Sequence, residues 1–372
     1  MHTASLSPDA FESVLARLPP DLDVDALALA TRAIERARKI VDGKALLRLA
    51  LARGPGGLSL NQTAAWATMA GLPPLSDPSL KYRLDKAVPF LKALMERQLA
   101  SQARSTTLHW PGRVLRLVDG TSIEQPASTG TDWRVHAGFD LGSGSFSHLE
   151  LTDGRGAESI ERGAPVAGEV RIGDRNYANA GPLHRLCQQA GHVDFIVRVR
   201  WKGFALTRPD GTPFDLVGHL ATLSQDAGPQ DAGPQDVLVH ARVSGTERLP
   251  MRLIIQRRPP AHAESTRQHL RRNASRKQKR LDPRSLVAAE FLIVATSLPA
   301  LGYPADEVLT AYRLRWQIEL AFKRLKSLLH IGQVPTRTAA ASQSWLYAHL
   351  ILALLCDGLS QEVLASSPSG RC

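Results

Sequence analysis

The chain has 372 residues, enough for two or three domains with substantial cores, which excludes a peptide or a disordered tail. Its 46 Lys and Arg exceed its 35 Asp and Glu, and the formal net charge of +11 favours a polyanionic partner. Three widely separated cysteines (Cys187, Cys356, Cys372) form neither a disulfide framework nor a zinc-binding pattern, so we expect a reducing compartment. No export signal and no run of 18 apolar residues is visible, so a soluble, intracellular protein is predicted.

Residues 1–108 are expected to form a helical domain, because apolar residues recur at spacings of three and four across 28–51 and 82–99. Between these stretches, residues 58–80 have the pattern of a helix, a glycine-containing turn and a second helix, as in a helix-turn-helix. A plain helical bundle would give the same pattern. We expect this domain to contact DNA.

Strand-like runs begin at Arg113. Those at 113–118, 133–141 and 147–152 are consistent with an antiparallel meander. A strand at 168–173, a helix and a strand at 193–201 then form a β-α-β unit, so the sheet is mixed and 109–201 is the first part of an α/β core.

Residues 202–290 are predicted to be a β-rich insertion, with strands at 237–243 and 249–256. A basic stretch follows at 257–284, with ten Lys or Arg and two acidic residues. It is either a solvated surface or, as we prefer given the excess of charge, a helix that contacts phosphates. The core resumes with a strand at 291–296 and helices at 306–329 and 344–359, so 291–372 is its second part.

The helix predicted at 306–329 contains the most informative pattern. At 100° per residue, its polar residues fall on a single stripe opposite an apolar face. The stripe consists of Tyr312, Arg315, Glu319, Lys323 and Lys326. An ordinary amphipathic helix, with Glu319 in spacing-four ion pairs, is the simpler interpretation of this stripe taken alone.

Two further acids favour a catalytic interpretation. Asp119 and Asp174 each end an apolar strand, and strand-end carboxylates beside a helical carboxylate indicate a divalent-metal site. Phosphodiester chemistry uses one cation to activate the attacking oxygen and another to stabilise the leaving oxygen. Surrounding cations would relieve the repulsion among the acids and hold DNA.

These residues resemble a known family. Tyr312-x2-Arg315-x3-Glu319-x6-Lys326 resembles the Y-R-E-K signature of bacterial insertion-sequence transposases of the insertion-sequence-4 family, which are DDE enzymes. Asp119-Gly120-Thr121 looks like the family's first catalytic aspartate, and Gly173-Asp174-Arg175-x-Tyr177 looks like its second. Position 176 is Asn where glycine is common, and Asn accepts unusual backbone angles.

The resemblance implies a ribonuclease-H-like catalytic core interrupted by a β-strand insertion domain. It implies metal-dependent cleavage at the ends of a mobile DNA element and strand transfer into target DNA, that is, cut-and-paste transposition. Asp119, Asp174 and Glu319 would bind Mg²⁺ or Mn²⁺, two ions per site. The residues that would hold DNA phosphates are Tyr312, Arg315, Lys323, Lys326 and, more weakly, Arg175. A homodimer in the synaptic complex, no membrane association and a location in the bacterial cytoplasm at the nucleoid are also implied.

Two alternatives come from other functional classes. A catalytically inactive relative that binds DNA ends would not need the three acids, all of which are present. A stand-alone metal-dependent DNA nuclease of the same fold would have less need of the helical N-terminal region and the basic insertion.

Overall fold

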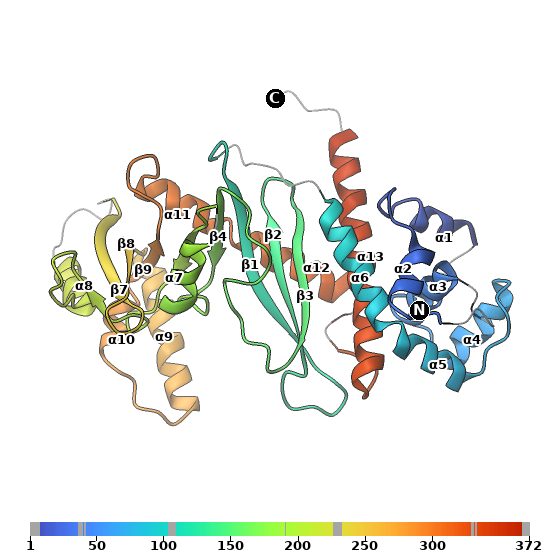
Figure 1. Ribbon diagram of the computed structural model, residues 1–372. Coiled ribbons are helices and arrows are strands. Elements are labelled where there is room, and N and C mark those ends of the chain that lie inside the picture. Colours follow the sequence, from blue (N-terminus) through green and yellow to red (C-terminus); the bar gives the residue numbers. More distant parts are fainter. Residues whose placement is uncertain are drawn as a thin grey trace. The chain divides into compact units, whose positions relative to one another are not determined.

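The computed structural model describes residues 8–35, 40, 42–102, 109–189, 191–225, 233–328, 331 and 333–366. The chain folds into two compact units, whose helices and strands are labelled in Figure 1. Unit 1 comprises Met1–Ser105, Gly120–Ala157 and Glu319–Cys372, and unit 2 comprises Thr106–Asp119 and Glu158–Ile318. Both units are therefore built from segments that are distant in sequence.

Unit 1 is mainly helical. Its helices are α1 (Pro8–Leu15), α2 (Val24–Ala30), α3 (Gly43–Arg53), α4 (Leu60–Met69), α5 (Asp77–Lys86), α6 (Val88–Ser101), most of α12 (Trp316–Leu328) and α13 (Ala339–Ser366). Its strands are the end of β1 (Val114–Ile123), with β2 (Trp133–Asp140) and β3 (Ser145–Asp153). β2 and β3 pair as an antiparallel hairpin.

Polar side chains fix the starts of the N-terminal helices. Asp23 and Asp42 accept hydrogen bonds from the first turns of α2 and α3. At α4, Ser59 and Gln62 form a reciprocal capping box, with Ser59 Oγ 3.2 Å from the Gln62 amide nitrogen. Gly43 begins α3 at a close approach to α2, where a Cβ would lie 2.5 Å from the Val24 carbonyl oxygen. The local sequence thus specifies where these helices begin.

The long helix α13 forms the centre of unit 1, where it packs against α3, α5, α6 and β3 (Figure 1). It is longer than the predicted 344–359. Its Ala339–Asp357 stretch is long and apolar enough to cross a membrane by length and composition, and 67% of that stretch is buried inside the protein. Burial of this extent is typical of a core helix.

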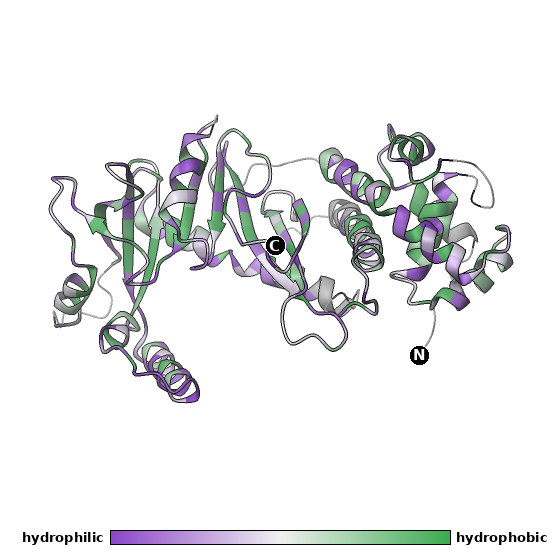
Figure 2. Ribbon diagram, turned by 60° about the horizontal axis from the view of Figure 1, so that its bottom comes forward, coloured by the Kyte–Doolittle hydropathy of each residue, from purple (hydrophilic) through white to green (hydrophobic). Residues whose placement is uncertain are grey.

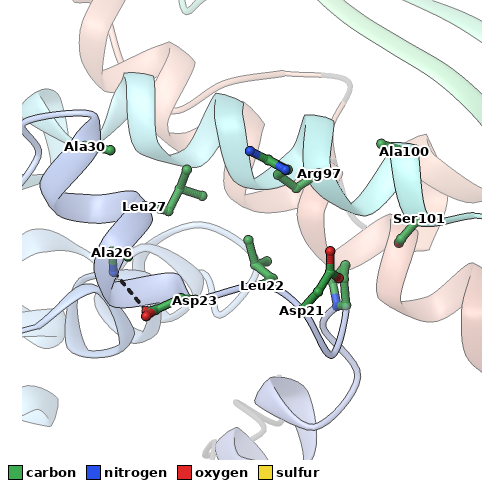
Figure 3. A pocket seen from close by; sticks show the side chains of 10 residues that line it. Asp21, Leu22, Asp23, Ala26, Leu27, Ala30, Arg97, Ala100 and Ser101 are labelled. Carbon is green, nitrogen blue, oxygen red and sulfur yellow. Dashed lines mark hydrogen bonds between the residues drawn. The ribbon is translucent and has the colours of Figure 1, made fainter.

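A pocket of unit 1 lies between the start of α2 and the end of α6 (Figure 3). Leu22 and Leu27 contribute apolar surface to it, and Arg97 projects from α6. The Asp23 carboxylate accepts the Ala26 amide at 2.9 Å, so its oxygen is used to cap α2. The Asp23 side chain at this pocket therefore has a structural role as the N-cap of α2.

Unit 2 is an α/β unit. Its strands are the start of β1, β4 (Glu169–Gly173), β5 (Asp194–Arg198), β6 (Leu206–Thr207), β7 (Gln235–Arg242), β8 (Arg248–Arg257) and β9 (Phe291–Thr296). Its helices are α7 (Ala180–Gln188), α8 (Leu216–Gln225), α9 (Pro260–Arg276), α10 (Arg284–Ala288), α11 (Ala305–Arg313) and the first turn of α12.

The strands of unit 2 form one sheet in the order β1-β4-β5-β9-β8-β7-β6. β1, β4 and β5 are parallel neighbours, and α7 forms the crossover between β4 and β5. The remaining pairs are antiparallel, including β8 with β9. Strands from the 202–290 segment therefore extend the core sheet. Their inward residues, Val239, Leu253 and Ile255, share one apolar core with Phe195 and Leu183.

The expected α/β fold class is confirmed, with a mixed sheet and a parallel β-α-β unit. Two element predictions are wrong. β1 continues past Asp119 to Ile123, because Thr121 and Ile123 keep the alternating burial of a strand. The helix predicted at 306–329 is interrupted: α11 ends at Arg313, and α12 begins at Trp316.

Candidate active site

Two of the predicted catalytic acids are carried by neighbouring parallel strands of unit 2: Asp119 lies in β1, and Asp174 directly follows β4. β1 and β4 pair from Val114 with Glu169 to Leu117 with Ile172, and the same register continued two residues brings Asp119 opposite Asp174. β4 and β5 pair up to Gly173 with Val197, so one further step brings Asp174 opposite Arg198. Asp119 within β1, Asp174 directly after β4 and Arg198 at the end of β5 thus stand in a row across three adjacent strands.

The position of Asp174 is fixed by the turn that follows β4. One Asp174 carboxylate oxygen accepts the Asn176 amide at 2.7 Å, and the Asp174 carbonyl accepts the Tyr177 amide at 3.2 Å. The Tyr177 ring packs on Gly173, where a Cβ would lie 3.0 Å from ring and Cβ atoms. Gly173 and Tyr177 of the second motif therefore hold the aspartate between them.

Asn176 has a role that its position in the motif did not predict. It is not among the described residues with positive φ, so an unusual backbone angle does not explain it. Its side chain instead accepts a hydrogen bond from Arg200 at 2.9 Å and donates to Glu158 at 3.4 Å. Asn176 thus links the turn to the loop that precedes β4.

The electrostatic field at Tyr177 indicates that the acids converge. Burial raises the pKa of the Tyr177 hydroxyl far above its usual range, and the negative charges of Asp119, Glu158 and Asp174 raise it further. Among the residues that the structure describes, no group of three or more His, Cys, Asp or Glu is close enough to hold a metal ion. Unit 2 thus contributes a pair of carboxylates to this site.

The loop before β4 is held by a buried arginine. Arg171, fully buried on β4, donates to the carbonyls of Ile160, Arg162 and Gly163 at 2.7 to 2.9 Å and to Glu169 at 2.8 Å. Arg116 on β1 lies 3.0 Å from the same Glu169 carboxylate. This ion cluster fixes the loop that presents Glu158 beside Asn176.

Tyr312 and Arg315 flank the break between α11 and α12. Bonds from Leu314 to Ala311 and from Arg315 to Tyr312 are of the i to i−3 type, so the chain tightens here instead of continuing as an α-helix. The prediction of a single polar stripe is therefore wrong, because it assumed one unbroken helix over 306–329. Tyr312 is also only 9% exposed, where an exposed face was expected.

The hydroxyl of Tyr312 lies within the same electrostatic environment as Asp174. Burial raises its pKa, and the neighbouring Arg315 and Arg198 guanidinium groups oppose that change. Burial lowers the pKa of Arg198, which also interacts with Arg175 and Asp174. Unit 2 therefore brings together Asp119, Asp174, Arg175, Tyr312 and Arg315, with Arg198 as an addition.

Glu319 and Lys323 belong to unit 1, where both are exposed on α12. The helix is anchored within that unit by Phe322, whose ring centroid lies 6.4 Å from that of Phe146 on β3. The side chain of Lys326 lies outside the described residues. Glu319 therefore lies on a helix that packs on β3 of the β2–β3 hairpin through Phe322.

Comparison with known proteins decides the family. Residues 110–355 match the family model described as the transposase DDE domain. The chain belongs to this family. It is 38% identical over 97% of both chains to the putative transposase InsL for insertion sequence element IS186A of Escherichia coli (strain K12). It is equally similar, over 97% of both chains, to the transposase for insertion sequence element IS421 of Escherichia coli.

More distant relatives include the transposase for insertion sequence element IS231F of Bacillus thuringiensis subsp. israelensis, which is 23% identical over 76% of this chain and 65% of the relative. A solved piggyBac transposase synaptic complex with hairpin DNA has a TM-score of 0.48 and 9% identity, and the match covers all of this chain and 78% of that one. The expected function is confirmed at the level of the family: this chain is a DDE transposase, an enzyme that acts on DNA.

Arg198 is a candidate site residue that the sequence did not predict. The signal was present: Phe195-Ile196-Val197 is the apolar part of the strand after the second aspartate, and an arginine ends it. Only the parallel register shows that this arginine is level with Asp174, because spacing along the chain does not specify which strands are neighbours.

Proposed function

We propose that Asp119, Asp174 and Glu319 are the catalytic acids of this transposase and that they act in cut-and-paste transposition. The observation that carries this proposal is the parallel pairing of β1 with β4, whose register, continued by two residues, brings Asp119 opposite Asp174. Glu319 enters by its place in the family signature and by its exposure on α12. Divalent metal chemistry is general in this family, and the choice of Mg²⁺ or Mn²⁺ in a pair is part of the proposal.

The donor set fits such ions. Carboxylate oxygens are the ligands that hard divalent cations prefer; Asp119 and Asp174 would supply them from paired strands, and Glu319 would supply a third. Bound metal would activate water or a 3′-hydroxyl and stabilise the leaving oxygen. The chain's own task is to fix the carboxylates, and the turn at Asp174 and the buried Arg171 cluster serve it.

The cationic residues would hold the scissile strand. Arg175 is exposed beside Asp174, and Arg315 lies next to Tyr312, so both can meet phosphate oxygens near the acids. Lys323 and Lys326 would extend these contacts along α12. We propose further that the protein acts in the cytoplasm at the nucleoid, without a membrane, and as a homodimer when two element ends are paired.

A strand-transfer assay tests the proposal. Purified full-length protein with Mg²⁺ or Mn²⁺ would receive DNA bearing the inverted repeats that flank its own gene, together with a target plasmid. Asp119→Asn, Asp174→Asn and Glu319→Gln should each reduce joined product by at least about 10³-fold, since each removes a metal ligand without changing shape. Asp282→Asn, which only removes a surface ion pair with Arg284, is the matched control and should retain activity.

The same assay separates the alternatives. Specific end binding without cleavage by the unaltered protein would indicate an inactive relative. Cleavage without joining would indicate a nuclease. Activity that survives any of the three substitutions would show that the residue concerned is not a catalytic acid.

A further inference from the structure

A groove in unit 2 has a composition that the catalytic proposal does not explain. It has a volume of about 1270 Å³ and lies where the end of β8, the start of α9 and the end of α11 meet. Its cationic residues are Arg198, Arg257, Arg258, Arg267 and Arg313. Glu290 is its acidic residue.

Three of these arginines are not in ion-pair contact with a carboxylate in the described part of the chain, although Arg198 interacts with Asp174 at longer range. Glu290 forms ion pairs with Arg257 and Arg267. Within the described ranges, no ion pair involves Arg198, Arg258 or Arg313. Arg258 donates to the Thr266 hydroxyl at 3.1 Å and Arg313 to the Gln256 side-chain oxygen at 3.3 Å, both neutral partners that hold the side chains in place.

Burial makes this arrangement unfavourable without an anion. Arg198 and Arg258 are each only partly exposed, and both line the groove. Positive charges therefore lie close together where water is partly excluded. Burial lowers the pKa of Arg258, and the neighbouring Arg198 charge lowers it further. A bound phosphate would offset both effects, because guanidinium groups pair with phosphate oxygens in a bidentate way.

The groove is connected to the candidate active site through Arg198. This residue lines the groove and also stands level with Asp174 at the end of β5. At the other side α9 begins at Pro260 without a side-chain cap, so the positive end of a 17-residue helix lies at the groove. In Figure 2, much of the α9 ribbon has the colour of hydrophilic residues.

We propose that this groove binds the sugar-phosphate backbone of the DNA strand that continues from the scissile phosphate, with Arg258 and Arg313 as its anchoring residues. The proposal rests on the proposed catalytic role of Asp119 and Asp174 and adds a binding surface outside the signature residues. Arg198 forms the junction between the catalytic acids and the groove.

The salt dependence of DNA binding tests it. Full-length protein without divalent metal would be titrated with a fluorescent DNA fragment bearing its inverted repeat at several salt concentrations. The logarithm of the binding constant falls as the logarithm of the salt concentration rises, and each lost phosphate contact makes this slope less steep by about one. Arg258→Gln with Arg313→Gln should therefore make the slope less steep by about two. The matched control, Arg242→Gln with Arg248→Gln on paired residues of β7 and β8, removes the same charge outside the groove and should leave the slope unchanged.

A scan with single methylphosphonates gives the position on the DNA. Neutralising the contacted phosphates should weaken binding by the unaltered protein but not by the groove variant, and those phosphates should adjoin the cleavage site. The inference is overturned if the groove variant keeps the slope of the unaltered protein. It is also overturned if the groove variant and the control variant reduce the steepness of the slope equally. Strand transfer by the unaltered protein in the same preparations shows whether the proposed function stands when the groove inference fails.

Discussion

Gly173 lies directly before Asp174, and the Tyr177 ring packs against it. A methyl group at position 173 would lie 3.0 to 3.1 Å from Tyr177, closer than side-chain atoms normally approach, so the turn that fixes Asp174 must shift. We expect Gly173→Ala to reduce strand transfer at least tenfold and to cost about 1–3 kcal/mol of unfolding free energy. Urea denaturation and the joining assay measure the two effects. Gly130→Ala, with open space around it, should change neither.

Arg171 stabilises the loop before β4 through hydrogen bonds to its backbone carbonyls. Arg171→Met would leave three carbonyl oxygens and the buried Glu169 carboxylate short of donors, a change that typically costs about 3–5 kcal/mol. The exposed pair of Arg185 and Glu161 provides the contrast, because surface ion pairs contribute about 0–1 kcal/mol. Unfolding midpoints of Arg171→Met and Arg185→Met should therefore differ widely. Similar midpoints would mean that the buried cluster does not stabilise the loop.

At the scale of elements, α7 covers the β-α-β unit and can be monitored through Cys187. Burial on this helix raises the pKa of the Cys187 thiol to about 11. The thiol's contribution to stability is complete below its unfolded pKa of about 9 and is lost as pH rises through 11. Alkylation by iodoacetamide, followed by peptide mass spectrometry, should thus accelerate about tenfold per pH unit from 8 to 10. A rate that levels off near pH 9 would show that α7 leaves the thiol exposed to water.

Elements with a strong local pattern were predictable, and their partners were not. The run Phe291–Thr296 is a strand with the predicted ends because it is continuously apolar. The break near Leu314 has no Pro or Gly to signal it, and the helical period continues across it, so the sequence predicts one helix. The two aspartates were identified by their strands and motifs. Their alignment with each other and with Arg198 depends on strand order, a property of the folded sheet.

At the scale of the whole molecule, the proposed acids are divided between the two units. Asp119 and Asp174 belong to unit 2, and Glu319 begins the last segment of unit 1. The strand β1 and the helix α12 each contribute residues to both units, so the chain crosses between the units next to Asp119 and again next to Glu319.

Iron-directed cleavage of the polypeptide tests whether the three acids share a metal site. Fe²⁺ substituted for Mg²⁺, with ascorbate and peroxide, produces hydroxyl radicals that cut the backbone close to the ion. We expect fragments ending near residues 119, 174 and 319, because a shared ion must lie within a few ångströms of all its ligands. Asp119→Asn with Asp174→Asn should remove all three cuts, while Asp282→Asn should retain them. Cuts near 119 and 174 alone would assign the metal to unit 2 and exclude Glu319 as its ligand.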